Sequence, residues 1–195
     1  MEGTDSAAVA RARAGDREAF QALVEKHSRN VFRLAFRMTG SEEDAEDVVQ
    51  ETFLKAYRSL QRFAGQAEFS TWIHRIAANC AVDLLRRRVP RQADLRTDEG
   101  EEVELAAGGA GPERMAFSAE VQDRVARSLE RLTAMERAAF VLRHFEGRPI
   151  AEISRTLGVR TGAAKNCVFR AVAKLRQDLS PLVGELRRST RTKSG

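Results

Sequence analysis

The chain has 195 residues, of which 43% are hydrophobic and 31% are charged, and its formal net charge is +5. This composition is typical of a folded, helix-rich protein, and the excess of positive charge favours a polyanionic partner such as a nucleic acid. The sequence contains no run of 18 apolar residues and no apolar core of signal-peptide length near its start, so we expect a cytoplasmic protein without membrane insertion.

Helix-forming residues with a regular apolar spacing dominate the first half of the chain. Gly40 is expected to end one helix and Ser41 to cap the next, since glycine suits a helix C-cap and serine an N-cap. Ser70 or Thr71 is expected to cap a further helix, after a loop over residues 63–69. The spacing predicts four helices, over residues 7–14, 16–39, 41–60 and 70–88.

The third predicted helix, SEEDAEDVVQETFLKAYRSL, has one apolar face and one polar face. Six acids lie between positions 42 and 51 with no base among them. Acids in a first helical turn complement the helix dipole, so they have a purely structural explanation. An exposed leucine beside these polar groups favours a protein-binding face instead. The candidate residues on that face are Asp47, Gln50, Glu51 and Leu54.

The fourth predicted helix, STWIHRIAANCAVDLLRRR, also has two unlike faces. Its apolar stripe is expected to be buried and contains Trp72, Ile73, Ile76, Ala77, Cys80, Leu84 and Leu85. The opposite face carries His74, Arg75 and Asn79, and the helix ends in Arg86, Arg87 and Arg88. These arginines are either solvated or lie against a negatively charged partner.

Composition changes twice after residue 90. Residues 91–118 contain the sequence GGAGP and five acids between Asp98 and Glu104, which predicts a flexible acidic linker. Residues 119–183 return to helical spacing. Residues 184–195 are expected to form a basic, disordered tail.

The stretch IAEISRTLGVRTGAAKNCVFRAVAKLR predicts two helices joined by a tight turn at Gly158, with Thr161 as the cap of the second helix. This is the layout of a helix-turn-helix, whose second helix reads the major groove of DNA. Residues 137–195 hold 13 lysines and arginines against four acids, which supports DNA binding over the alternative, a helical hairpin without DNA contact. The outer face of the second helix carries Thr161, Lys165, Asn166, Phe169, Arg170 and Lys174.

No motif in the sequence predicts catalysis. The three histidines are scattered, and there is no glycine-rich phosphate loop, CxxC or HExxH motif. Cys80 and Cys167 each lie on the apolar side of a predicted helix and are expected to be core residues. We therefore expect no enzymatic activity, no catalytic residue, no metal site and no cofactor.

Three of these stretches together resemble the extracytoplasmic-function (ECF) sigma factors of RNA polymerase. DAEDVVQETFLKAY resembles the helix of that family that binds core polymerase. FSTWIHRIAANCAVDLLRRR resembles the helix that reads and melts the −10 element. LTAMERAAFVLRHFEGRPIAEISRTLGV with GAAKNCVFRAVAKLR resembles the domain that reads the −35 element. The resemblance covers about residues 10–90 and 119–180.

The resemblance implies an all-α fold of two small helical domains joined by a flexible linker. Sigma region 2 would occupy residues 7–90 and region 4 residues 119–183. The implied function is that of an alternative sigma factor, which binds core RNA polymerase and promoter DNA and directs promoter-specific initiation. An anti-sigma factor is a further expected partner. A stand-alone helix-turn-helix regulator is the alternative.

The resemblance also assigns roles to the candidate residues. The outer face of the third helix would bind polymerase, and the outer face of the helix-turn-helix would read the −35 element. The loop over 63–69 would hold a base flipped out of the −10 element. Ala163-Ala164 and Asn166-Cys167 depart from the family's usual Thr-Val and Ser-Arg pairs, which implies an unusual −35 sequence. The residues implied for the −10 element are Phe63, Phe69, Arg75, Asn79, Arg86, Arg87 and Arg88, and we expect the second domain, the linker or an anti-sigma factor to occlude the polar ones in the free protein.

Overall fold

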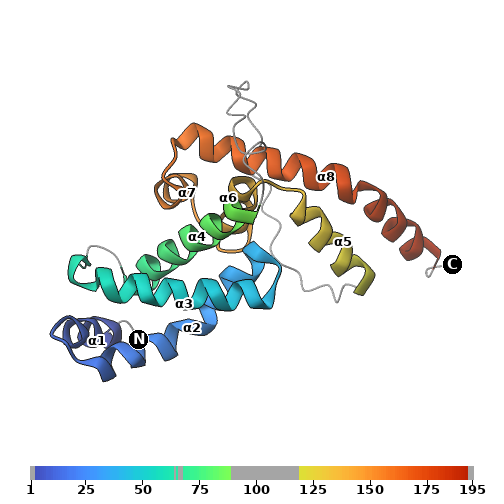
Figure 1. Cartoon of the computed structure of the whole chain (residues 1–195). Helices are drawn as coiled ribbons and strands as arrows, with labels where there is room; N and C mark the ends of the chain where they lie inside the picture. The colour runs from blue at the N-terminus through green and yellow to red at the C-terminus, as the bar shows by residue number, and fades with distance from the viewer. Residues whose placement is uncertain (1–2, 64, 66–67, 89–118, 193–195) are drawn as a thin grey trace.

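The computed structural model describes the backbone of residues 3–63, 65, 68–88 and 119–192, and no strand occurs within these ranges. The helices fall into two units, one before residue 89 and one after residue 118 (Figure 1). The predicted all-α fold class is confirmed. The linker predicted for 91–118 lies outside the described residues.

The first unit is built around three long helices. α2, α3 and α4 pack against one another, and α1 packs on α2. The bounds of its elements are α1 (Gly3–Arg13), α2 (Arg17–Thr39), α3 (Glu42–Ser59), a 3-10 turn η1 (Leu60–Arg62) and α4 (Phe69–Arg88).

The junctions at the two ends of α2 follow from local capping chemistry. The carboxylate of Asp16 accepts a hydrogen bond from the first turn of α2 at 3.0 Å. Gly40 ends α2 with a φ of +76°, and its N–H donates to the carbonyl of Phe36 at 2.8 Å. The hydroxyl of Ser41 accepts a hydrogen bond from the N–H of Asp44 at 3.3 Å and caps α3. The predicted roles of Gly40 and Ser41 are confirmed.

The start of α4 differs from the prediction. The helix begins at Phe69, so Ser70 and Thr71 already lie in its first turn and neither is its cap. The Ser70 hydroxyl donates instead to the carboxylate of Glu68 at 3.3 Å. Phe69 is 3% exposed and packs among other aromatic rings. Tertiary packing of Phe69 therefore outweighs the capping preference that placed the start later.

Within residues 119–192 the second unit contains four helices, and α8 packs against the other three. The turn between α7 and α8 contains Gly158 at a φ of +66°, and the hydroxyl of Ser154 donates to the carbonyl of Val159 at 2.7 Å. α8 begins at Thr161, so Thr161 is its first helical residue and not the predicted cap. The bounds are α5 (Ala119–Glu130), α6 (Ala134–His144), α7 (Ile150–Leu157) and α8 (Thr161–Thr192).

The end of α8 lies much further along the chain than expected. The helix continues to Thr192, so the prediction of a disordered tail was wrong for residues 184–192. The prediction relied on the polar, basic composition of this segment, but leucine and arginine are also good helix formers. Pro181 lies inside the helix and does not end it. Residues 193–195 lie outside the described part of the chain.

A reciprocal capping box begins α6. The hydroxyl of Thr133 accepts a hydrogen bond from the N–H of Glu136 at 3.2 Å, and the carboxylate of Glu136 accepts one from the N–H of Thr133 at 3.0 Å. The same carboxylate oxygen lies 2.6 Å from Nζ of Lys174 on α8. The start of α6 is thereby tied to the middle of α8.

Removing this cap should destabilise the second unit measurably. We expect Thr133→Ala to lower the free energy of unfolding by about 0.5–2 kcal/mol, because it leaves an N-terminal N–H of α6 without a partner. Urea titration followed by circular dichroism measures this change. Thr71→Ala removes a hydroxyl that caps no helix and should change stability by less than about 0.5 kcal/mol. Equal losses in the two variants would contradict a capping role for Thr133.

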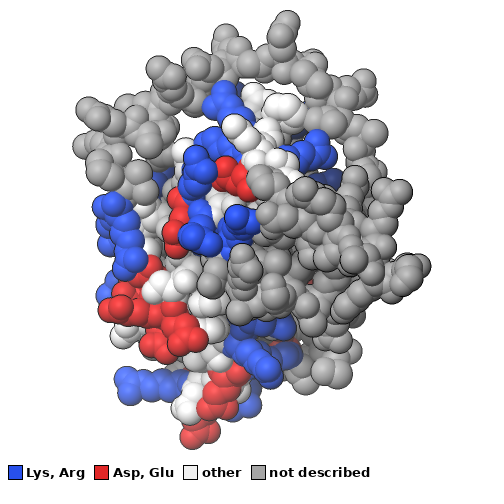
Figure 2. All heavy atoms as spheres, turned by 90° about the vertical axis from the view of Figure 1, so that its right-hand side faces the viewer, with Lys and Arg blue, Asp and Glu red and all other residues white. Residues whose placement is uncertain are grey.

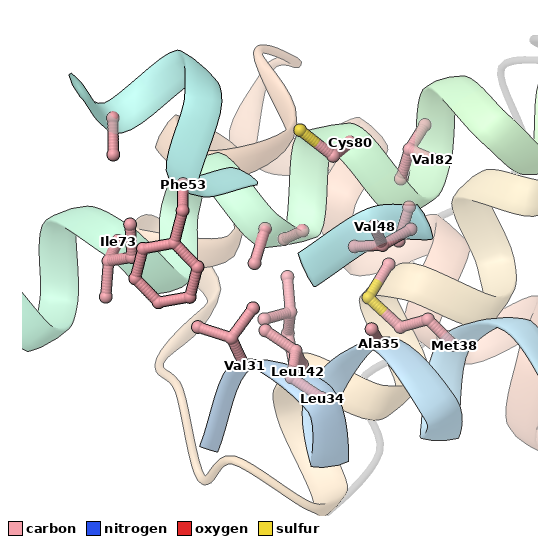
Figure 3. Close-up of a cluster of buried hydrophobic side chains, with 14 of the residues drawn as sticks. Val31, Leu34, Ala35, Met38, Val48, Phe53, Ile73, Cys80, Val82 and Leu142 are labelled. Carbon is pink, nitrogen blue, oxygen red and sulfur yellow. The ribbon is translucent and has the colours of Figure 1, made fainter. Parts of the chain in front are cut away.

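One hydrophobic core extends through both units. Figure 3 shows Leu142 of the second unit beside Leu34 and Val31 of the first. α4 contacts α6 and α7, and α2 contacts α6. The core members contributed by the second unit are Ala138, Ala139, Val141, Leu142, Ile153 and Ala164. The two predicted domains are therefore packed against each other and share buried surface.

α4 is buried on more than the predicted stripe. Ala78, Ala81 and Val82 are each less than 5% exposed, although they lie outside that stripe. α4 contacts α2 and α3 as well as α6 and α7, so helices of both units bury it. His74, expected on the polar face, is half-buried, and its Nε2 atom is buried without a hydrogen-bond partner.

Candidate functional site

The outer face of α3 is exposed as its phase predicted. Asp47, Gln50 and Leu54 are exposed, Leu54 to 42%, and Glu51 is half-buried. The opposite side of the helix is fully buried at Ala45, Val48, Thr52 and Ala56. The side chain of Leu54 is therefore exposed to solvent among polar side chains, and the opposite face of α3 is buried in the core.

These four residues line one wall of a groove of about 520 Å³ between α3 and the C-terminal half of α4. The other wall carries Cys80, Leu84, Arg87 and Arg88. The fold therefore brings the acidic face of α3 next to the basic end of α4. Sequence reasoning had assigned these two segments to different surfaces.

Asp44 is a residue of this groove that sequence reasoning missed. It was counted only among the acids that complement the helix dipole, but it is 1% exposed and its carboxylate pairs with the guanidinium of Arg88. A buried carboxylate requires such a partner. Arg88, predicted to contact DNA, is thereby attached to the start of α3. No local signal distinguishes Asp44 from its acidic neighbours.

Lys55 forms a second link between α3 and α4. Its Nζ lies 3.4 Å from the carboxylate of Glu51 and 3.9 Å from that of Asp83 on α4. Burial raises the pKa of the nearby Cys80 thiol, an effect that Lys55 partly opposes. Cys80 is 3% exposed, so the thiol is a packed core group, as the sequence predicted.

The polar side chains of α4 lie on the surface. Arg75, Asn79, Arg86, Arg87 and Arg88 are all exposed. Of the three expected causes of occlusion, the second unit does not cover these residues, although α6 and α7 contact α4. The linker lies outside the described residues, and occlusion by it or by an anti-sigma factor stays a prediction. These residues remain accessible to a negatively charged partner.

The two phenylalanines predicted to contact a flipped base are buried. Phe63 is 9% exposed and Phe69 is 3% exposed. Their rings pack with Trp72, the Phe63 centroid 4.9 Å and the Phe69 centroid 5.6 Å from that of Trp72. The aromatic cluster thus anchors both ends of the loop over 63–69 and presents no free phenylalanine face to a base.

The outer face of the helix-turn-helix is largely as predicted. Thr161, Lys165 and Phe169 are exposed, Phe169 to 42%, and Asn166 and Arg170 are half-buried. These five side chains lie along the first three turns of α8, the helix that would enter a groove of DNA. Lys174 is different, since its ammonium is paired with the buried carboxylate of Glu136 at 2.6 Å. This ion pair of Lys174 joins α8 to α6 within the protein.

Charge is unevenly distributed over the surface. Acids gather in the first turn of α3 and bases in the last turn of α4. On the face shown in Figure 2, acidic side chains form a group in the lower half, with basic side chains above and below it. Among the described residues, no group of three or more His, Cys, Asp and Glu side chains could hold a metal ion. Within the same ranges, no helix is sufficiently long and apolar to cross a lipid bilayer.

Comparison with known proteins matches both units to one family. Residues 23–91 match Sigma-70 region 2, and residues 122–175 match Sigma-70, region 4. The chain is 36% identical over 187 residues to the ECF RNA polymerase sigma-E factor of Escherichia coli K12, covering 92% of this chain and 96% of the relative. The chain belongs to the ECF sigma factors. The RNA polymerase sigma-H factor of Pseudomonas aeruginosa PAO1 is 33% identical over 186 residues, covering 93% and 96% of the two chains.

Solved structures of similar chains agree with this family. The structure of CnrH in complex with the cytosolic domain of CnrY is 28% identical, with a TM-score of 0.62, and covers 92% of this sigma factor and 99% of CnrH. The sigma factor RpoE in complex with the anti-sigma factor NepR from Bartonella quintana is 21% identical, with a TM-score of 0.57, and shares the fold. It covers 83% of this chain and 96% of that one.

The family defines the general function of the chain. It is an alternative sigma factor, which directs promoter-specific transcription by RNA polymerase. The stand-alone helix-turn-helix regulator is not favoured, because the matches include region 2 as well as region 4. Sigma factors as a family are not enzymes.

Proposed function

We propose that this sigma factor binds core polymerase through the outer face of α3 and promoter DNA through α4 and α8. In this assignment region 2 corresponds to residues 7–90 and region 4 to residues 119–183. The chain itself catalyses no reaction, requires no cofactor and acts in the cytoplasm, where the polymerase works. The observation that carries the proposal is the exposure of Asp47, Gln50 and Leu54 along one helix face beside a groove.

The α3 face has the properties of a protein-binding surface. The exposed side chain of Leu54 supplies apolar contact area. The carboxylate of Asp47 and the amide of Gln50 supply a charge and hydrogen bonds that fix how a partner is aligned on the face. The residues that present them come from a helix whose opposite side is fully buried, so no local refolding is needed on binding. The other wall of the groove is basic, with Arg87 and Arg88. A partner that enters the groove must therefore fit next to the acidic side chains of α3 and next to these arginines.

The −10 element would be read by the exposed face of α4. Arg75 and Asn79 supply a cation and an amide, and Arg86 and Arg87 supply charge for backbone phosphates. Arg88 would need to remain paired with Asp44 or exchange it for a phosphate. Because Phe63 and Phe69 are buried, their proposed role becomes indirect: they anchor the loop between them, and its intervening residues would contact the flipped base.

The −35 element would be read by the first three turns of α8. Lys165 and Arg170 are suited to phosphates or guanine edges, Asn166 to adenine and Phe169 to a thymine methyl group. Thr161 at the helix start can donate to a phosphate. We assign Lys174 a supporting role, because its pairing with Glu136 fixes α8 against α6.

An anti-sigma factor is a further proposed partner. RpoE of Bartonella quintana is described in complex with an anti-sigma factor, and CnrH in complex with the cytosolic domain of CnrY. The second of these chains resembles this one over nearly its whole length. A regulator that covers the α3 face would compete directly with polymerase.

The polymerase assignment has a direct test. We expect Asp47→Ala with Gln50→Ala to weaken binding of the full chain to core polymerase about tenfold or more, because both side chains lie at the centre of the proposed interface. The affinity is measured by fluorescence anisotropy with labelled sigma factor. Circular dichroism should be unchanged, since neither side chain is buried.

A matched control removes the same groups from another helix. Gln21 and Glu25 are exposed on α2 and hydrogen-bonded to each other at 3.0 Å. Replacing both with alanine removes one amide and one carboxylate, as in the α3 variant, and should leave polymerase affinity unchanged. If the α3 variant binds polymerase as well as this control, the proposed interface is wrong.

A further inference from the structure

The N-terminal helix α1 takes no part in the polymerase and promoter contacts proposed above. The match to Sigma-70 region 2 begins at residue 23, so it assigns α1 no role. Figure 1 shows α1 at the end of the first unit where α3 ends and α4 begins. Val9 and Ala12 are each 6% exposed, and α1 contacts α2 and α4. The helix is therefore a packed element near the two ends of the loop over residues 63–69.

The C-terminal end of α1 is bonded to the segment that leads into this loop. The side-chain amide of Gln61 donates a hydrogen bond to the carbonyl of Arg13, the last residue of α1, at 2.7 Å. The last carbonyls of a helix have no partner within the helix, so this bond satisfies one of them. Gln61 lies in η1, two residues before Phe63. The hydrogen bond thereby connects α1 to the start of the loop.

The N-terminal half of α1 contacts a buried histidine of α2. The carboxylate of Asp5 lies 3.0 Å from Nε2 of His27 and 2.6 Å from Nζ of Lys26. Burial alone would raise the pKa of the Asp5 carboxyl, but its contacts with Lys26 and His27 outweigh burial and lower that pKa. Because an ionised carboxylate only accepts hydrogen bonds, Nε2 of His27 is the donor. His27 is 4% exposed, so this bond fixes the orientation of a buried imidazole.

The same imidazole packs on the residue that ends the loop. The ring centroids of His27 and Phe69 are 5.3 Å apart, and the two rings are tilted by 56°. This separation lies in the range of a favourable aromatic contact. Phe69 is the first residue of α4 and packs in turn on Trp72. Asp5, His27 and Phe69 thus form a continuous chain of contacts from α1 to the end of the loop.

One helix is therefore connected to both ends of the loop. Asp5 and Arg13 are eight residues apart in α1, which is about 12 Å along a helix. The helix is stiff, so it fixes the separation of its two attachment points. A segment whose ends are fixed before binding has less conformational entropy to lose when a ligand orders it. α1 thus contributes more to the first unit than the buried surface of Val9 and Ala12.

We propose that α1 positions the loop over residues 63–69 for the base flipped out of the −10 element. Asp5 and Gln61 are positioning residues, and neither touches DNA. A loop held in one arrangement discriminates between bases by shape, whereas a loop that can rearrange adapts to several. The proposal rests on the proposed function, which assigns the flipped base to this loop; the attachment of the loop ends to α1 does not.

The first test follows the loop ends without DNA. Trp72 is the only tryptophan, and its ring packs on those of Phe63 and Phe69. Quenching of its fluorescence by acrylamide therefore reports whether the rings at the loop ends stay packed. We expect Asp5→Ala with Gln61→Ala to increase the quenching constant of Trp72 in the full chain.

Two controls accompany this measurement. Gln21→Ala with Glu25→Ala removes one amide and one carboxylate from exposed positions of α2 and should leave the quenching constant unchanged. Asp5→Asn removes the charge but keeps an oxygen that accepts from His27, so it should stay closer to the wild type than Asp5→Ala. Equal constants in the double variant of Asp5 and Gln61 and in the α2 control overturn the attachment. If Asp5→Asn behaves like Asp5→Ala, the hydrogen bond to His27 is not its basis.

The second test measures base preference with the holoenzyme. Core polymerase carrying the wild-type or variant sigma factor binds a pool of single-stranded DNA with six consecutive randomised positions, and the bound strands are sequenced. We expect the wild type to enrich one base at the position that enters the loop. Asp5→Ala with Gln61→Ala should lower that enrichment about two- to tenfold, because ordering one more side chain on binding costs about this factor in affinity. Enrichment at the other positions should stay unchanged.

The outcomes separate this proposal from the function on which it rests. Increased quenching with an unchanged base preference overturns the positioning role. A uniform loss of enrichment at all positions shows that α1 only stabilises the fold, and it overturns the role as well. If the wild-type holoenzyme enriches no base, the assignment of the flipped base to the loop fails and the positioning role fails with it. The quenching constant then still decides whether α1 holds the loop ends.

Discussion

Replacing Lys165 and Arg170 with alanine is expected to abolish most of the affinity for a −35 duplex. The two side chains lie one and a half turns apart on the first half of α8, where a recognition helix contacts base edges and phosphates. Each lost base contact costs about 1–3 kcal/mol, which is about 5- to 150-fold in affinity. The double variant should therefore lose more than either single variant.

The salt dependence of binding distinguishes the two possible kinds of contact. A lost phosphate contact weakens binding to all sequences and reduces the slope of log affinity against log salt by about one. A lost base contact leaves the slope unchanged and relaxes the preference at one base pair. Arg29→Ala with Arg33→Ala, at two exposed positions on α2, lowers the net charge by the same two units and serves as the control. If the Lys165 and Arg170 double variant binds the duplex like this control at moderate salt, α8 is not the reading helix.

The helices themselves were predictable because their signals are local. Gly40 and Ser41 mark the α2–α3 junction through backbone and capping preferences that need no tertiary information. The apolar spacing of α3 placed Asp47, Gln50 and Leu54 outside, as observed. The errors at Ser70 and over residues 184–192 arose where tertiary packing or continued helix propensity outweighed a local capping or compositional rule.

The arrangement of the helices was not predictable in the same way. α4 is buried by helices of both units, but the additional contacts involve small residues such as Ala78 and Ala81, which produce no strong periodic signal. The partners of charged residues were also hidden. Asp44, Arg88 and Lys174 were assigned from the helix dipole, from the family resemblance and from helix phase, respectively. Each is engaged in an ion pair with a residue on another helix. A spacing rule identifies a face but not what lies opposite it.

Leu34→Ala is expected to be the most destabilising single substitution considered for this protein. Leu34 is 1% exposed, and Figure 3 shows it near Val31 and beside Leu142 of the second unit. Truncating a buried leucine costs about 2–5 kcal/mol, from lost apolar burial and from the cavity that remains. This is a large part of the roughly 5–15 kcal/mol that stabilises a typical domain. Phe36→Ala, on the same helix but 42% exposed, removes more carbon and should cost less.

Urea titration with two probes tests both the loss and the shared core. Trp72 is the only tryptophan and reports on the first unit, whereas circular dichroism reports on the helices of both. Because Leu34 lies in a core that both units build, the two probes should give one coincident transition, which Leu34→Ala moves to lower urea without changing its slope. Separate transitions would show that the units unfold independently. In that case Leu34→Ala should shift the tryptophan transition alone, and the buried contact with Leu142 would contribute little to the free energy of unfolding.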